Sequence, residues 1–266
     1  MCKLFTILTA LLVVCSAPAA WAADMATRQV TETLVKSSRD NPADFSGLDL
    51  SYLDLSTLDF KGANLSEADL YGTDFTAANL SGANLSHTRL DRAVLIRADL
   101  SGARLDGATV LRPTAFSDMR FNLAEAPSFK GASMVGARIQ AKLDGADFSR
   151  ANLTDADFSP YEDRAGEGTI TTVPRNELSN AKFVAANLTK ANLSRAVVKF
   201  ADFSDADLKG ASFRDTDLTQ SNFVGADFSG ADLTGADFAG ANLGGAKGLE
   251  SAIGLEAALN LATARR

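Results

Sequence analysis

The residues best suited to acid–base chemistry lie together in one polar segment. Tyr161, Glu162, Asp163, Arg164 and Glu167 place three carboxylates and a base close together in the chain. Paired carboxylates act as acid and base in sugar-cleaving enzymes. Such catalysis requires a fixed geometry, and the sequence supplies no partner residues at a defined separation. We therefore favour an exposed, charged loop that binds a partner, and we predict no catalytic residue.

The supply of nucleophiles and metal ligands is equally limited. His87 is the single histidine, and both cysteines, Cys2 and Cys15, lie near the start of the chain. A His-based zinc site needs more ligands, and a Ser-His-Asp arrangement would depend on His87 alone. We expect His87 to be a surface residue, and we expect no metal, no cofactor and no enzymatic activity.

The N-terminus has the pattern of a secretory leader. Lys3 precedes an apolar run over residues 4–15, and Ala20-Trp21-Ala22 is a small-x-small cleavage site. The run is short for a membrane span. We expect a bacterial Sec-type signal peptide over residues 1–22, and a periplasmic or secreted mature chain without a transmembrane segment. An uncleaved anchor is the alternative.

Composition limits the classes of partner. The chain has 266 residues, a net charge of −7 and a pI of about 4.8, so we expect no direct binding to nucleic acid. Arg92, Arg97, Arg104 and Arg112 form a modest basic run that could meet an acidic partner. Local charge balance is the simpler interpretation of these arginines. The 16 phenylalanines outnumber three tyrosines and one tryptophan, which indicates a dry interior.

Most of the chain repeats every five residues. Each unit has a central Leu or Phe, an Ala two residues earlier and an Asp or Asn between them, as in residues 225–245. The Ala and the central residue share parity, so they face the same way in a short extended segment. Because five is odd, the next central residue of a straight strand would face the opposite side. The chain must therefore turn within every unit. Successive coils would then stack about 4.7–4.9 Å apart.

The segment ANLSEADLYGTDFTAANLSGANL, residues 63–85, resembles the pentapeptide-repeat family with its motif A(D/N)LXX. The resemblance covers residues 43–247 and implies an all-β fold, a right-handed quadrilateral parallel β-helix with four pentapeptides per coil. Residues twenty apart would lie above one another, which predicts a core column of Phe183, Phe203 and Phe223. Some members of the family resemble B-form DNA and bind DNA gyrase.

Breaks in the rhythm suggest how the chain is organised. We expect a helical cap or linker over 23–42, in which Ala26, Val30 and Leu34 have helical spacing. A one-residue deletion falls between Ile139 and Leu143, and a Phe116-to-Phe121 step could persist in the first break. The remaining ranges are repeats over 43–110, an irregular coil or loop over 111–128, repeats over 129–158, an inserted loop over 159–177, repeats over 178–247, and a tail over 248–266. The tail has good helix formers and would be a helical cap or a contact for a homodimer, since open β edges invite pairing.

These features favour a non-enzymatic, exported scaffold of the bacterial envelope that binds a protein partner of unknown identity. The alternative is a DNA-mimicking rod that binds DNA gyrase or another topoisomerase, as the resemblance implies. A polysaccharide-acting β-helix enzyme is a remote alternative, because fold alone does not determine function.

Overall fold

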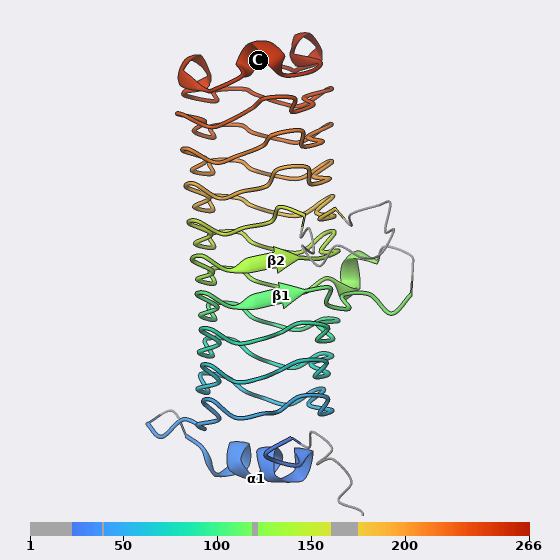
Figure 1. Cartoon of the computed structure of the whole chain (residues 1–266), viewed down its shortest axis with the longest axis vertical. Coiled ribbons are helices and arrows are strands. Elements are labelled where there is room, and N and C mark those ends of the chain that lie inside the picture. Colours follow the sequence, from blue (N-terminus) through green and yellow to red (C-terminus); the bar gives the residue numbers. More distant parts are fainter. Residues whose placement is uncertain (1–22, 39, 119–121, 161–174) are drawn as a thin grey trace, which may run out of the picture.

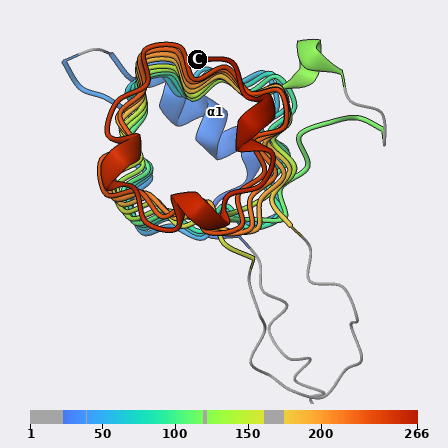
Figure 2. The same ribbon diagram turned by 90° about the horizontal axis from the view of Figure 1, so that it is seen from above.

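The computed structural model describes residues 23–38, 40–118, 122–160 and 175–266, which wind into one four-sided coil (Figures 1 and 2). Stacked coils are joined by parallel bridges, and most bridges join residues twenty apart, as in Asp44 with Asn64 and Asp207 with Asp227. Four pentapeptides therefore complete each coil. Within the described ranges, no helix is long and apolar enough to cross a membrane.

Regular secondary structure is sparse because each side of a coil is only a few residues long. Strand β1 (Thr109–Leu111) pairs in parallel with β2 (Arg138–Gln140). The remaining elements are α1 (Thr27–Lys36) and the 3-10 helices η1 (Leu123–Glu125), η2 (Leu249–Ser251), η3 (Leu255–Ala257) and η4 (Leu261–Thr263). Elsewhere, the sides of the coil pair through single bridges.

An Asp or Asn in the middle of a unit holds the turn that follows it. Asp227 Oδ1 accepts hydrogen bonds from Ser229 N at 3.0 Å and from Ser229 Oγ at 2.6 Å. The next residue, Gly230, has a φ of +67°, a left-handed conformation that glycine adopts without steric cost. Where the middle residue is Asp or Asn, it therefore fixes the turn at the corner as well as facing solvent.

The alanine and central positions of the repeat fill the interior. Phe203 is fully buried and Ala206 is 1% exposed. Five rings form one stacked column, with centroids 4.6–5.0 Å apart and planes within 10° of parallel: Phe129, Phe148, Phe183, Phe203 and Phe223. The packing leaves no wet interior at this column, which accounts for the preference for phenylalanine.

The first break keeps more of the coil than the sequence suggests. Thr114 pairs with Val94, and the buried residue at the central position is Ala115. Phe116 is only half-buried, so the proposed Phe116-to-Phe121 step is wrong at its first residue, while Phe121 lies outside the described residues. Pro113 is buried at the position two residues before Ala115, where most units have alanine, and the unit stays in phase with the coil below.

Later bridges show how the breaks are absorbed. Arg138 pairs with Asp157, nineteen residues on, which reflects the one-residue deletion between Ile139 and Leu143. Lys142 pairs with Glu177, thirty-five residues on, so the chain returns to the same side of the coil after the second break. The buried Asn176 closes this seam: its Oδ1 accepts from Ala141 N at 2.6 Å, and its Nδ2 donates to the carbonyl oxygens of Ile139 and Phe158.

The two ends of the coil differ. Helix α1 covers the first coil with the fully buried Val30, and Thr27 Oγ1 donates to Asp54 O at 3.0 Å. The tail, predicted as a helical cap or a homodimer contact, forms three short 3-10 helices rather than one continuous helix. Gly248, Gly254 and Asn260 adopt left-handed conformations every six residues, which divides the tail into η2, η3 and η4 around a last coil (Figure 2).

Candidate interaction face

One side of the coil is bordered by both breaks in the repeat, and we call it the insert face. Its middle residues, in chain order, are Asp54, Asp74, Val94, Thr114, Lys142, Glu177, Val197, Asp217, Asp237 and Leu259. The chain leaves one of its corners after Ser117 and continues into η1, which projects from the coil in Figure 2. Residues 159–160 and 175–176 lie at its other corner, because they join the sides that contain Asp157 and Glu177.

The described part of the first insertion is fixed to its corner. Ser117 donates to the Glu125 carboxylate from its backbone N at 2.7 Å and its Oγ at 2.8 Å. Arg97 N donates to Glu125 O at 2.7 Å. The hydrogen bonds from Ser117, with a smaller contribution from the positive charge of Arg97, lower the pKa of the Glu125 carboxyl group. Glu125 is therefore ionised at neutral pH and holds η1 beside the insert face.

A cluster of two tyrosines and three arginines occupies the lower part of the other corner. We call Tyr52, Tyr71, Arg89, Arg92 and Arg112 the tyrosine–arginine corner. The rings of Tyr52 and Tyr71 meet edge to face, with centroids 5.3 Å apart. The guanidinium carbons of Arg89 and Arg92 lie 4.7 and 5.9 Å from the centroid of the Tyr71 ring, within the range of a cation–π contact.

The cluster is held in place by neighbouring groups. Arg89 forms a two-point ion pair with Asp69, from Nε at 3.0 Å and from Nη2 at 2.7 Å. The Tyr52 ring lies over Gly72, where an added Cβ would come within 2.9 Å of the ring. A glycine one coil above Tyr52 therefore makes room for the ring.

Exposed aromatic residues at the corners carry a conformational cost. Tyr52 is 71% exposed with a φ of +59°, and Phe200, at the opposite corner of the insert face, is 58% exposed with a φ of +57°. Bulky residues rarely adopt this conformation, and each such residue costs about 1–3 kcal/mol. Neither side chain is buried, so burial does not offset this cost.

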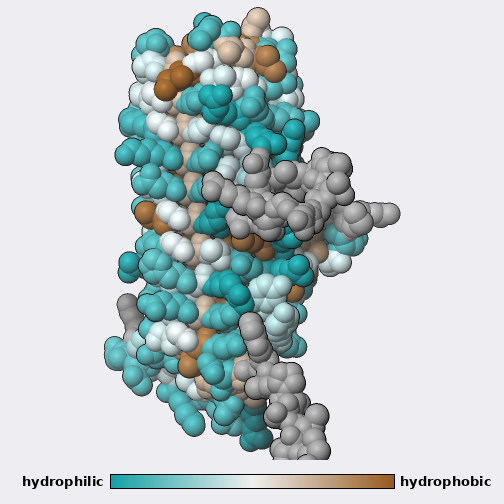
Figure 3. Space-filling model, in the orientation of Figure 1, coloured by the Kyte–Doolittle hydropathy of each residue, from teal (hydrophilic) through white to brown (hydrophobic). Residues whose placement is uncertain are grey.

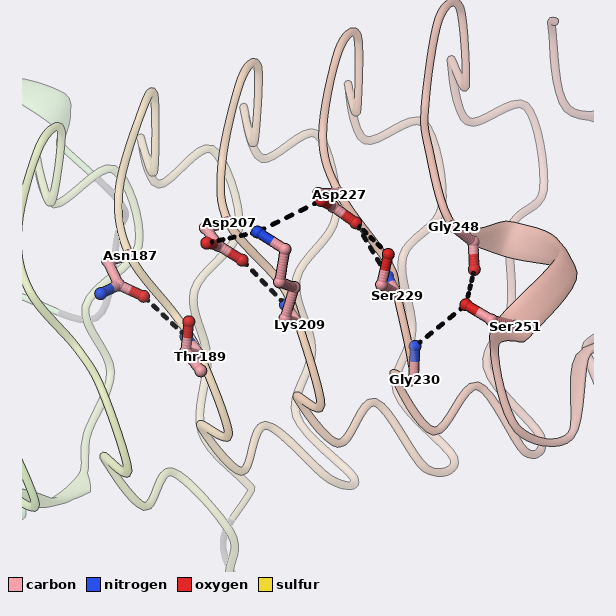
Figure 4. Close-up of polar contacts among 9 residues, drawn as sticks. All are labelled: Asn187, Thr189, Asp207, Lys209, Asp227, Ser229, Gly230, Gly248 and Ser251. Atoms are coloured by element: carbon pink, nitrogen blue, oxygen red, sulfur yellow. Dashed lines mark hydrogen bonds and ion pairs between the residues drawn. The ribbon is translucent and has the colours of Figure 1, made fainter.

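Most charges elsewhere on the coil are balanced locally. Lys209 Nζ lies 2.9 Å from Asp207 and 3.2 Å from Asp227, between carboxylates on neighbouring coils (Figure 4). These contacts raise the pKa of Lys209, and hydrogen bonds from Ser229 followed by Lys209 lower that of Asp227. The side of the molecule seen in Figure 3 is accordingly mostly hydrophilic, with scattered hydrophobic residues.

The structure describes only some of the residues that the sequence singled out. Tyr161, Glu162, Asp163, Arg164 and Glu167 lie outside the described residues. His87 is an exposed corner residue whose ring lies over Gly107. The described ranges contain no group of three or more His, Cys, Asp or Glu residues placed to hold a metal ion.

The four arginines of the basic run also lie in different places on the coil. Arg104 pairs with Asp106 at 2.9 Å, Arg97 lies beside η1, and Arg92 and Arg112 share the tyrosine–arginine corner. Sequence reasoning overlooked this corner because its contacts join residues about twenty apart. Comparison of residues twenty apart, such as Tyr52 with Gly72 and then Arg92, could have found it.

Comparison with known proteins supports the repeat assignment. A model of the pentapeptide-repeat family matches eight copies, over residues 43–76, 73–109, 139–159, 177–215 and 211–247. No curated protein sequence matches the chain.

Among solved structures, HetL, a pentapeptide repeat protein involved in heterocyst differentiation regulation in the cyanobacterium Nostoc, is 27% identical with a TM-score of 0.41, covering 88% of this chain and 94% of its own. QnrB1, a plasmid-mediated fluoroquinolone resistance protein, is 22% identical with a TM-score of 0.25, covering 77% and 90%. A pentapeptide repeat protein from the thylakoid lumen of Arabidopsis thaliana is 25% identical with a TM-score of 0.23, covering 45% and 69%. With more than half of its residues matched by the family model, this chain belongs to the pentapeptide-repeat family.

Proposed function

We propose that the protein is an exported, non-enzymatic scaffold that binds a partner protein through the insert face. The carrying observation is that four of the seven exposed large apolar side chains among the described residues lie on or beside this face. Tyr52 and Phe200 stand at its two corners, Leu123 on η1 is 57% exposed, and Leu259 in its last coil is 53% exposed. Isolated apolar residues on a surface need no explanation, but several around one flat face favour an interaction site.

The filled interior supports the non-enzymatic part of the proposal. Alanine, leucine and phenylalanine occupy the coil from the first repeat to the last, so a substrate could meet only the outer faces.

Export is tested by fractionating cells that produce the full chain with a C-terminal tag. We expect the tagged protein in the periplasm or medium, with a mass that corresponds to cleavage after Ala22. An intact chain that remains in the cytoplasm would contradict the proposal.

Partner binding is tested by cross-linking the mature protein in envelope extract and identifying the cross-linked residues. We expect the captured protein to be cross-linked to the insert face and to be lost when Tyr52 and Phe200 are both replaced by Asn. A variant altered on the opposite side, Asn187→Ser, is the control. Absence of any stoichiometric partner, or cross-links spread over all four sides, would count against a scaffold of this kind.

The alternative function, gyrase binding by DNA mimicry, has less support. A DNA mimic needs an extended negative surface, whereas Lys209 and Arg214 pair with carboxylates of neighbouring coils. We expect the mature protein to leave gyrase supercoiling unchanged. Inhibition or protection of gyrase at micromolar protein would favour the alternative.

A further inference from the structure

We propose that the tyrosine–arginine corner is the docking site for an acidic segment of the partner protein. The inference rests on the proposed scaffold function and names the chemistry of what is bound. Arg92 and Arg112 would bind carboxylates of the segment, and Tyr52 with Tyr71 would pack against an apolar side chain beside them.

The two arginines are placed to act together. Arg92 N donates to Leu111 O at 2.8 Å, so the backbones of Arg92 and Arg112 lie on neighbouring coils, about 4.8 Å apart. In the described part of the chain, neither guanidinium forms an ion pair. A guanidinium presents a planar pair of donors that matches a carboxylate, and both side chains are available for that contact.

The nearest acidic groups are already engaged. Asp91 Oδ1 accepts a hydrogen bond from Leu111 N at 3.1 Å, and Asp69 holds Arg89. Asp74 accepts from Thr76 N at 2.8 Å, which closes its own turn. These carboxylates serve the turns and the ion pair of the coil, so Arg92 and Arg112 keep their donors for an incoming group.

The tyrosines are ordered before binding. Tyr52 is confined between Gly72 and the edge of Tyr71, while Arg89, fixed by Asp69, covers the Tyr71 ring. Ordering such side chains in advance reduces the entropy lost on binding. Tyrosine and arginine are also the residue types that dominate the binding energy of protein interfaces.

An acidic protein segment fits the corner better than a nucleic acid does. A phosphate backbone repeats its negative charge along its whole length, and binding it draws on many basic contacts at once. A short segment with one or two carboxylates beside an apolar side chain needs only the two arginines and the two rings.

The test uses a displayed library of random twelve-residue peptides selected against the mature protein. We expect selected peptides to be rich in Asp and Glu with at least one aromatic or aliphatic residue. Their affinity should fall at least tenfold in the variant Arg92→Gln/Arg112→Gln, and by a similar factor in Tyr52→Asn. His87→Asn is the matched control, since it removes an exposed ring of the same left-handed conformation, which also lies over a glycine one coil above, from a corner outside the insert face. It should change the affinity less than twofold.

Several results would overturn the assignment. They are peptides without acidic enrichment, peptides that bind the arginine variant as tightly as the unaltered protein, or a DNA duplex that binds the corner more tightly than the best peptide. Thermal melts of all variants would show that each is folded. If the envelope partner is still captured by the arginine and tyrosine variants, the docking site is wrong while the scaffold function stands. If no partner is captured by the unaltered protein, the scaffold function itself fails.

Discussion

Replacing Phe203 by leucine should reveal how much the stacked column contributes to stability. Phe203 is fully buried, and its ring stacks on Phe183 at 4.6 Å and on Phe223 at 4.9 Å. Leucine is a natural occupant of the central position, as at Leu208. The substitution therefore keeps an apolar residue in place and removes the ring contacts.

The matched control is Phe158→Leu. Phe158 is equally buried, but among the described residues its ring meets only Phe148, at 6.3 Å and edge to face. Phe203 also meets Phe213 edge to face at 6.0 Å, so the two sites differ by the two stacked pairs. Each aromatic pair contributes about 0.5–1.5 kcal/mol beyond burial. Phe203→Leu should therefore cost about 1–3 kcal/mol more than Phe158→Leu, and Phe203→Ala about 3–5 kcal/mol in all.

The assay is urea unfolding of the mature protein, followed by circular dichroism. Because a repeat rod can open locally, native-state hydrogen exchange of the amides near Phe203 supplies a second measure. Equal costs for the two leucine variants, within about 0.5 kcal/mol, would refute the idea that stacking adds to burial in this core.

Three further predictions concern the turns and the seam. The pKa of the Asp227 carboxyl group is lower in the folded protein than its unfolded value of 3.8, so its ionised form stabilises the fold above that pH, and this stability is lost as pH falls through the folded pKa. Thermal melts down to about pH 2 should therefore show a smaller loss of stability in acid for Asp227→Asn than for the unaltered protein. Asn176→Ala should lower the free energy of unfolding by about 1–3 kcal/mol, because it leaves buried backbone groups without partners. Urea unfolding measures this change, and an unchanged midpoint would contradict the role of Asn176 in closing the seam. Gly107→Ala would place a Cβ 2.5 Å from His87 Nδ1, so a double-mutant cycle with His87→Ala should recover part of its cost; additive costs would show that the two side chains do not meet.

Much of the fold could be predicted because each repeat is only five residues long and the same pattern recurs many times along the chain. The parity of Ala226 and Phe228, for example, is enough to place both side chains inside. The double role of Asp227 was harder to see, because its hydrogen bonds to Ser229 are not needed to explain an exposed polar residue. In the tail, favourable helix composition concealed the left-handed residues Gly254 and Asn260, which are the N-caps of η3 and η4.

The tyrosine–arginine corner could not be predicted from local pattern. Tyr52 lies in an ordinary repeat, and only the neighbouring coils supply Gly72 against its ring and Arg92 beside the Tyr71 ring. Contacts between stacked coils join residues about twenty apart, so they leave no pattern among neighbouring residues of the sequence. The charged segment that attracted attention in the sequence, beginning at Tyr161, lies outside the described residues.

The unbroken ring column has a consequence for how such a rod can change length. Phe148 lies nineteen residues from Phe129 and thirty-five residues from Phe183, yet both gaps leave the rings parallel at 4.9–5.0 Å. Additional sequence is therefore accommodated at a corner without disturbing the layers above and below it. The corners of the insert face thus provide splice points for grafting new peptides, and repeated duplication could extend the rod while each graft keeps a defined height and direction.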